Sequence, residues 1–352
     1  MSEGGRFRMQ EAVVSEAPSG STRPVSSAWR PMLAALSIVM CLVHSTSALA
    51  GEAFPDKPIS YVVPNAPGGS GDVIARSLSE ALSKDLGVAV VVHYKPGAAG
   101  VIGAQFVARS NADGYTLLVS STGPMAIVPN LSPNLPYDAE RAFSPVIKIA
   151  DSHTVLAVSA SKPWHTVQDL VKASKAAPGT MSFGSGGNGT VLHLQGELLK
   201  LRTGLDAVHV PYKGDAPAVS DLLAGNVSMM FVPTQSIAAL VEAGQIRVIA
   251  TTSPHRLNSL PEVPTMAEAG VQDFASDAWF GAYVPARTPP AVIARLNTSF
   301  NKALKDPVVI GRLEKLGLTV AGGEPSSLLA AQKEDMTRWA QVIKAANVHA
   351  GE

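Results

Sequence analysis

From Ile59 onward the chain alternates short strand-like segments with amphipathic helix-like segments, and short loops rich in glycine and proline separate them. The first strand, residues 59–63, is followed by a helix over residues 72–86 in which Ile74 and Leu78 share one face. This alternation is typical of an open, largely parallel sheet covered by helices. We therefore predict an α/β fold.

Two extended stretches interrupt the alternation, one at residues 143–159 and one at residues 277–284. We interpret them as the places where the chain crosses between two lobes and returns. Ligands of open α/β sheets bind at the carboxyl ends of the strands, so a cleft between the lobes is the expected site. The predicted division is residues 1–50 as an N-terminal extension with a signal peptide, residues 51–152 plus 276–352 as lobe 1, and residues 153–275 as lobe 2.

Two glycine-rich loops each follow a predicted strand and precede a predicted helix. They are PGGSGD at residues 67–72 and GSGGNG at residues 184–189, the second followed by a helix from Thr190. Glycine leaves backbone N–H groups uncovered, and the first N–H groups of a helix lack partners and lie at the positive end of its dipole. Each loop therefore suits an anion, and the pair predicts one small acidic ligand held from two sides.

The second loop also has a competing interpretation, because Gly184, Gly186 and Gly189 fit the G-x-G-x-x-G pattern of dinucleotide-binding folds. That interpretation requires an acidic residue at the end of the next strand. The next predicted strand ends in Tyr212 and Lys213 instead, and Asp215 comes late. A third reading, a tight turn without a ligand, remains open for either loop alone.

The N-terminal fifty residues have the layout of a secretory signal. An apolar run at residues 32–43 follows Arg30 and leads to the small residues of STSALA, which predicts cleavage near Ala50 and a periplasmic location. The run is short for a membrane span, although an uncleaved anchor is the alternative. The polar stretch before it leaves Met9 or Met32 as other possible start sites.

Composition excludes several classes of function. The first fifty residues hold four of the 28 basic and three of the 28 acidic residues, so the remainder carries a net charge near −1. That charge offers no basic surface for nucleic acid. Cys41, the only cysteine, lies inside the apolar run, so the mature chain would have no cysteine for a disulfide, a zinc site or a nucleophile.

An ordered series of short motifs resembles the substrate-binding proteins of tripartite tricarboxylate transporters, the Bug family. The motifs run through most of the mature chain and are Pro67-Gly68-Gly69 with Asp72 and Arg76, NADGYTL (111–117), LPYD (135–138), GNGTVLHL (187–194), VPYKG (210–214), LPEVPTMAEAG (260–270) and Trp279-Phe280-Gly281. The resemblance implies a two-lobed periplasmic binding protein of the type II kind that closes over a carboxylate. The ligand would be an organic acid, an acidic amino acid or a nicotinate-like acid, delivered to the membrane subunits of the transporter.

The resemblance also implies that backbone amides of Ala66–Ser70 and Ser185–Thr190 hold the carboxylate oxygens. This chain departs from the family at Asn65, where the family often has an aromatic or bulky residue, so the wall of the site would be more polar here. The predicted ligand-binding residues are Asn65, Ala66, Gly68, Gly69, Ser70, Asp72, Ser120, Thr122, Ser185, Gly187, Asn188, Gly189, Thr190 and Asp215.

Some of these residues have structural roles that compete with ligand binding. Asp72 can accept a ligand ammonium group or complement the helix dipole, and the structural role is favoured. Thr190 can cap its helix, contact the ligand, or do both. His193 is expected to be a buried hydrogen-bonding residue, and with Glu197 it forms only part of a metal site, so no metal or cofactor is expected.

Two other function classes remain as alternatives. A periplasmic sensor acting on a membrane signalling partner would share the same binding chemistry. A secreted α/β hydrolase is disfavoured, because neither Ser70 nor Ser182 lies in a complete G-x-S-x-G elbow. We therefore predict a monomeric binding protein without enzymatic activity.

Overall fold

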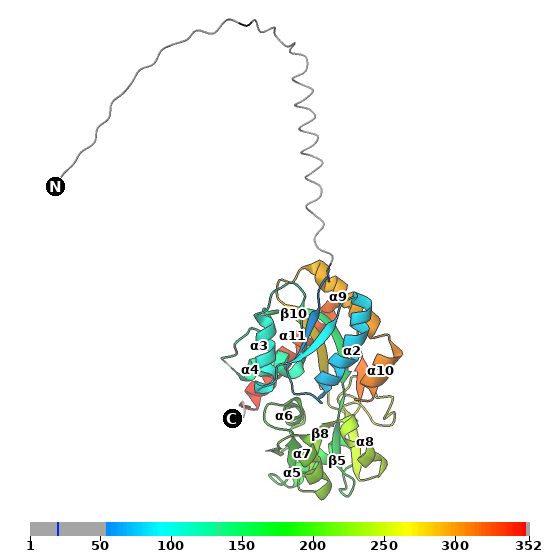
Figure 1. Ribbon diagram of the computed structural model, residues 1–352. Coiled ribbons are helices and arrows are strands. Elements are labelled where there is room, and N and C mark those ends of the chain that lie inside the picture. The colour runs from blue at the N-terminus through cyan, green and yellow to red at the C-terminus, as the bar shows by residue number, and fades with distance from the viewer. Residues whose placement is uncertain (1–19, 21–53, 133, 350–352) are drawn as a thin grey trace, which may run out of the picture. The chain divides into compact units, whose positions relative to one another are not determined.

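The computed structural model describes residue 20, residues 54–132 and residues 134–349. The predicted signal peptide, its cleavage near Ala50 and Cys41 lie outside the described residues. From Phe54 onward the chain forms one compact unit that contains two mixed sheets with helices on both faces (Figure 1). Within the described ranges, no helix combines the length and the apolar character needed to cross a membrane.

The first sheet has six strands in the order β11–β4–β10–β3–β1–β2. Its strands are β1 (Ile59–Val63), β2 (Val90–Tyr94), β3 (Thr116–Ser121), β4 (Phe143–Ser152), β10 (Ala278–Pro285) and β11 (Leu318–Val320). β1 is parallel to β2 and β3, whereas β10 is antiparallel to β3 and β4, and β11 is antiparallel to β4. This sheet defines the first lobe.

The second sheet has five strands in the order β7–β6–β8–β5–β9, all from the stretch of chain between β4 and β10. They are β5 (Thr154–Ser159), β6 (Ser182–Ser185), β7 (Val208–Pro211), β8 (Met229–Pro233) and β9 (Ile246–Thr251). β6 is parallel to β7 and β8, whereas β5 is antiparallel to β8 and β9. This sheet defines the second lobe, although the residue boundaries predicted from the sequence stay a prediction.

The prediction of largely parallel sheets is therefore wrong. The antiparallel pairs all involve the strands at the two crossings or their neighbours. β4 carries the chain out of the first lobe and β10 brings it back, so the two adjacent strands must run in opposite directions. In the second lobe, β5 runs away from the crossing, whereas β8 ends beside it at the pair Thr154–Pro233.

Helices cover both faces of the first sheet. One face is covered by α2 (Ser70–Leu86), α9 (Pro290–Ala303) and α10 (Pro307–Glu314), and the other by α3 (Val101–Ala108), the turn η4 (Gly123–Ile127) and α11 (Pro325–Ala345). In α2, Ile74, Leu78 and Leu82 are fully buried at intervals of four, and the helix ends at Gly87 in the left-handed conformation. The sequence therefore determines this helix by periodicity and by its C-terminal glycine.

The second sheet is covered on one face by α5 (Val167–Ala176) and α6 (Val191–Thr203), and on the other by α7 (Asp215–Ala224) and α8 (Thr234–Glu242). One buried cluster contains residues of both lobes, among them Leu194 of α6 and Trp339 of α11, and these two helices pack together. The lobes are thus joined by shared apolar burial as well as by the crossing strands.

Three regions contain elements that were not predicted from the sequence. α10 and β11 were not predicted, and the proline-rich passage after β3 is helical at η4 and at α4 (Val128–Leu131). Pro124 and Pro129 occupy the first turns of these two short helices, where a missing N–H has no cost. A short turn of this kind has no hydrophobic periodicity for the sequence to reveal.

Candidate functional site

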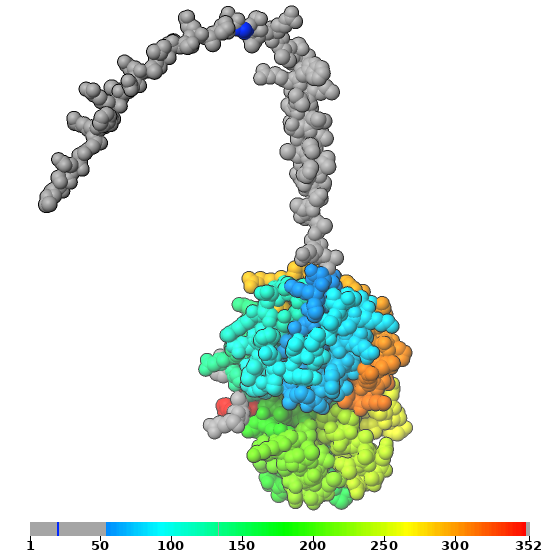
Figure 2. All heavy atoms as spheres, in the orientation of Figure 1, coloured from blue at the N-terminus to red at the C-terminus, as the bar shows by residue number. Residues whose placement is uncertain are grey.

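The two glycine loops lie at strand ends that face the junction of the lobes. The end of β3 pairs with the beginning of β10 at Ser121 and Phe280, and the end of β8 pairs with the beginning of β5 at Thr154 and Pro233. Since β1 and β6 are parallel to β3 and β8, their carboxyl ends point toward the same junction. In Figure 2 the blue and cyan residues of the first lobe meet the green residues of the second along this boundary.

The first loop leads into α2 with Gly69 at the N-cap and without a side chain that caps the helix. The N–H of Gly68 donates to Asp72 Oδ2 at 2.7 Å. The N–H groups of Ser70 and Gly71 donate to no group among the described residues. They belong to the first residues of a 17-residue helix, at the positive end of its dipole, and such helix starts bind anions.

Asp72 is fully buried beneath this loop and is used by the first lobe itself. Besides Gly68, it accepts a hydrogen bond from the Tyr94 hydroxyl at 2.8 Å, and Arg76 Nε lies 2.9 Å from its Oδ1. Burial alone would raise the pKa of Asp72, but the bonds from Gly68, Tyr94 and Arg76 together lower it below its usual range. The carboxylate is therefore ionised and shapes the loop, in line with the structural role favoured from the sequence.

The second loop leads into α6, and Thr190 caps this helix by accepting a hydrogen bond from the His193 N–H at 3.3 Å. Gly187 donates its N–H to Ser185 Oγ at 3.2 Å, and Gly189 donates its N–H to His193 Nδ1 at 3.0 Å. By contrast, among the described residues no acceptor lies within hydrogen-bonding range of three other N–H groups of this loop and helix start. They belong to Gly186, Asn188 and Val191.

The second loop approaches the first lobe directly. A Cβ atom built on Gly189 would lie 2.6 Å from Leu131 Cδ1, and Leu131 belongs to α4 of the first lobe. Gly189 also has a φ of +72°, which favours glycine. On the first-lobe side, Gly100 packs against Pro124 and Pro64, so the loops after β1, β2 and β3 are in contact with one another.

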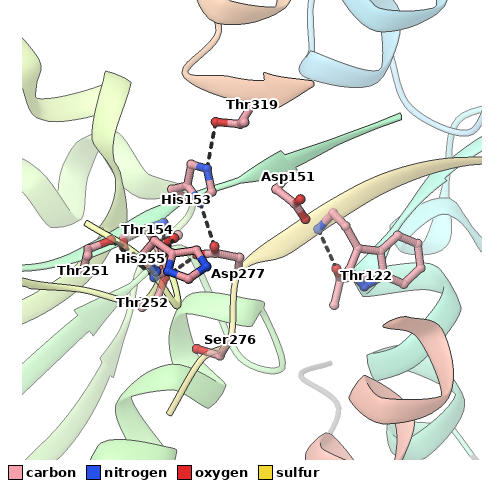
Figure 3. A network of polar contacts seen from close by, with 12 residues as sticks. Thr122, Asp151, His153, Thr154, Thr251, Thr252, His255, Ser276, Asp277 and Thr319 are labelled. Atoms are coloured by element: carbon pink, nitrogen blue, oxygen red, sulfur yellow. Dashed lines mark hydrogen bonds and ion pairs between the residues drawn. The ribbon is translucent and has the colours of Figure 1, made fainter. Parts of the chain in front are cut away.

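The remaining predicted site residues have different environments. Asn65, Ala66 and Gly68–Gly69 are exposed at the first loop, and Asn188 is exposed at the second. Ser120 and Thr122, by contrast, are buried. Thr122 Oγ1 accepts a hydrogen bond from the backbone N–H of Trp279 at 2.9 Å (Figure 3), and the Ser120 hydroxyl has no hydrogen-bond partner among the described residues. Asp215 is half-buried against Gly186, and burial raises its pKa.

Neither loop contains a lysine or an arginine, and the two histidines beneath the second loop are neutral at pH 7. Burial lowers the pKa of His193 to about 4 and that of His209 to about 3. A ligand carboxylate between the loops would therefore be stabilised by backbone N–H groups and helix dipoles. His209 was not singled out from the sequence, because it reaches the second loop only through the pairing of β6 with β7.

The crossing segments carry a polar network that sequence reasoning missed (Figure 3). His153 bonds to Asp277 and Thr319, and a cavity of about 580 Å³ lies beside it. Several charged groups that line this cavity pair with one another, as Lys148 does with Asp151 and Arg338 with Asp335. Among the described residues no group of three or more His, Cys, Asp or Glu side chains could hold a metal ion.

Two α/β lobes joined by crossing strands, with opposed loops at the facing strand ends, form the architecture of periplasmic solute-binding proteins. Residues 74–348 match the family described as "Tripartite tricarboxylate transporter family receptor", TctC. The chain belongs to this family, a family of periplasmic substrate receptors, which confirms the resemblance inferred from the motifs.

Two relatives match nearly the whole chain. The "UPF0065 protein in tcbD-tcbE intergenic region" of Pseudomonas sp. (strain P51) is 41% identical over 315 residues, which cover 89% of this chain and 93% of the relative. BugT of Bordetella pertussis is 35% identical over 314 residues, which cover 89% and 96%.

Two solved structures that contain carboxylates are also similar. Rpa4515 of R. palustris with adipate is 33% identical with a TM-score of 0.70, and the match covers 84% of this chain and 99% of that one. MatC of Rhodopseudomonas palustris with bound malate is 28% identical with a TM-score of 0.67, and the match covers 82% and 100%.

Proposed function

We propose that this protein captures a small carboxylate between its lobes and delivers it to the membrane subunits of a tripartite tricarboxylate-type transporter. The observation that carries the proposal is that both facing loops present backbone N–H groups that no other described residue accepts. They belong to Ser70 and Gly71 in one lobe and to Asn188 and Val191 in the other. The adipate and malate bound by two similar proteins support the same ligand class.

The expected binding free energy favours hydrogen bonds to the ligand from both lobes. Hydrogen bonds to a charged group contribute about 1.5–3 kcal/mol each, so four of them offer roughly 6–12 kcal/mol against an association cost of about 4–15 kcal/mol. One lobe alone would supply half of that gain and would bind weakly. Closure of both lobes over the acid is therefore part of the proposal.

The binding proposal is tested with thermal-shift and calorimetric titrations of the mature protein. We expect stabilisation by adipate, malate or a related acid, amounting to about 2.7 kcal/mol at a hundred times its Kd. The dimethyl ester of the same acid should have no effect, because it lacks the anionic oxygens. If no acid stabilises the protein and a cationic or esterified compound does, the proposed ligand class is wrong.

The donors themselves are tested by proline substitution at the first position of each helix, where proline removes only the N–H and is well tolerated. The preceding residues Gly69 and Thr190 have ψ values of 172° and 159°, which a following proline requires. Ser70→Pro and Val191→Pro should each weaken binding about ten- to a hundredfold, as expected for one charged hydrogen bond. Ser70→Ala and Val191→Ala keep the N–H groups and should lose far less.

Delivery to a transporter is tested separately from binding. Uptake of the identified acid by cells or vesicles that contain the membrane subunits should require this protein. Binding without any contribution to uptake would instead favour a periplasmic sensor. We further propose export with cleavage near Ala50 and a monomeric mature protein, to be checked by mass spectrometry and light scattering.

A further inference from the structure

Two histidine rings are stacked directly beneath the glycine loop of the second lobe. The ring centroids of His193 on α6 and His209 on β7 lie 3.6 Å apart, and their planes differ by 9°. The ring of Phe183 packs against both histidines, with centroid distances of 4.9 Å to His209 and 6.2 Å to His193. α6 comes close enough for this arrangement because Gly196 has no side chain to meet Phe183.

Each ring is connected to the backbone of the loop. His193 Nδ1 accepts the N–H of Gly189 at 3.0 Å. His209 Nε2 lies 2.7 Å from Ser185 Oγ, and that hydroxyl accepts the N–H of Gly187 at 3.2 Å. The histidines therefore engage the N–H groups of Gly189 and Gly187, the second through Ser185, whereas no acceptor among the described residues engages those of Gly186 and Asn188.

The His193 ring has to be neutral for this arrangement. His193 Nδ1 can accept a hydrogen bond only if the proton sits on Nε2, which lies 3.9 Å from Glu197 Oε1. Two protonated rings in contact would also repel each other. Burial lowers the pKa of both histidines, and the Lys200 ammonium, paired with Glu197 at 2.9 Å, lowers them further.

We propose that His193 and His209 are positioning residues of the anion site: they hold the N–H groups of Gly189 and Gly187 inward, so that those of Asn188 and Val191 remain available to the ligand. The inference rests on the proposed function only where ligand affinity is concerned. The orientation of the loop is a property of the ligand-free protein and is measurable by itself.

The test compares His193→Asn with His193→Leu. The side-chain oxygen of asparagine can occupy the place of Nδ1 and accept the Gly189 N–H, whereas leucine has a similar volume and no acceptor. We expect the Gly189 amide to exchange with solvent slowly in the parent protein and in His193→Asn, and much faster in His193→Leu, as measured by nuclear magnetic resonance without ligand. Carboxylate affinity should fall about tenfold or more in His193→Leu and be largely retained in His193→Asn.

A purely structural role for His193 predicts a different result. Both variants would then lose thermal stability, and any folded fraction would bind the acid like the parent. A folded His193→Leu protein with parental affinity would overturn the inference, as would unchanged exchange of the Gly189 amide. If the parent protein binds no carboxylate at all, the proposed function fails, and amide exchange alone decides whether His193 holds the loop.

His209 provides a second pair of variants in case His193→Leu does not fold. The amide of His209→Gln can replace Nε2 as the partner of Ser185 Oγ, whereas His209→Met cannot. The exchange of the Gly187 amide should be fast in His209→Met and slow in His209→Gln, with a parallel difference in affinity. Equal exchange and equal affinity in these two variants would contradict the positioning role.

Discussion

The imidazole Nδ1 of His153 lies 2.6 Å from Oδ2 of Asp277, and these two residues belong to the two segments that connect the lobes. His153 Nε2 also lies 2.9 Å from Thr319 Oγ1 of β11, and Asp277 Oδ1 accepts a hydrogen bond from Thr252 at 2.8 Å (Figure 3). The pair therefore joins the outgoing segment, the returning segment and both sheets at one point.

This pair predicts a pH-dependent stability. Burial lowers the pKa of His153, but the hydrogen bond and charge of Asp277, aided by the charge of Asp151, raise it above its usual value. A raised pKa means that the stabilisation is fully present below about pH 6.5 and is lost as the pH rises through the pKa of the folded protein. We expect Asp277→Asn to reduce the free energy of unfolding by about 1.5–3 kcal/mol at pH 6.

Chemical denaturation of parent and Asp277→Asn between pH 6 and pH 9 measures this effect. The difference between the two proteins should shrink as the pH rises. Thr319→Val, which removes the neutral partner of His153 and no charge, serves as the control and should show a difference that is constant with pH. A constant difference for Asp277→Asn as well would mean that the pair is not charged in the folded protein.

Because Gly189 lies close to Leu131, we expect closure of the lobes to be sensitive to one methyl group added at position 189. In Gly189→Ala the new Cβ would lie 2.6 Å from Leu131 Cδ1, so we expect weaker carboxylate binding. Gly204→Ala is the matched control, because its φ of +66° gives similar backbone strain and no atom lies within 4 Å of its Cβ.

Calorimetry on the two glycine variants, with circular dichroism to monitor folding, checks this prediction. Both variants should lose about 1 kcal/mol of stability from the left-handed backbone, and only Gly189→Ala should lose affinity. Adding Leu131→Ala to Gly189→Ala should restore part of the affinity. If the double variant binds no better than the single one, the contact with Leu131 is not the cause.

The buried carboxyl group of Asp335, in the first lobe, predicts that the protein loses stability as the pH rises. Burial raises the pKa of Asp335 to about 6, although the charge of Arg338 and the hydrogen bond from the Trp279 indole N–H counteract the rise. Compared with the unfolded chain, the folded protein therefore favours the protonated form of Asp335. The free energy of unfolding falls as the pH rises from about 4 through 6. Relative to Asp335→Asn, the parent should lose about 2–3 kcal/mol between pH 4 and pH 7.

Urea denaturation at several pH values measures that slope. Glu334→Gln is a second variant: the charge of Glu334 also raises the pKa of Asp335, so its removal should make the slope shallower. An Asp335→Asn protein whose stability follows the parent at every pH would show that folding leaves the pKa of Asp335 unchanged.

In the turn η3 (Ala98–Gly100), we expect the substitution of an alanine by glycine not to destabilise the protein. Ala98 and Ala99 have φ values of +47° and +51°, a conformation that costs an alanine about 1–2 kcal/mol. Ala99→Gly removes this cost and loses about 0.4–1 kcal/mol through the unfolded chain, so we expect stability to be unchanged or up to about 1 kcal/mol higher. Ala81→Gly, in the middle of α2, should instead lose about 1 kcal/mol, and equal losses in the two variants would argue against strain at η3.

The sequence predicted the elements that carry a strong local pattern. α2, with buried residues every fourth position and a glycine at its end, begins and ends close to the predicted residues, and α6, with Thr190 as its cap, begins where it was predicted. The strand directions were predicted wrongly, because pairing partners such as β4 and β10 are more than a hundred residues apart. The short elements α10 and β11 have too few residues for a periodicity to be evident.

In the candidate site, too, the local features were predictable from the sequence and the long-range contacts were not. The positions of both glycine loops and the structural role of Asp72 were predictable, since a helix start, a glycine turn and a carboxylate one turn away are local features. The sequence could not reveal which N–H groups remain free, because Ser185 and Gly187 depend on His209, which arrives from the neighbouring strand. Nor could it place Leu131 against Gly189, which is a contact between lobes.

The sequence by itself therefore determined the alternating α/β segments, the two loops suited to anions and the family. These depend on periodicity, turn residues and helix ends, which act over a few residues. The tertiary structure decided the directions of the crossing strands, the pairing of His153 with Asp277 and the set of N–H groups that the loops present. Those features depend on which distant segments pack together, because a hydrogen-bond donor is free only when no other part of the folded chain supplies its acceptor.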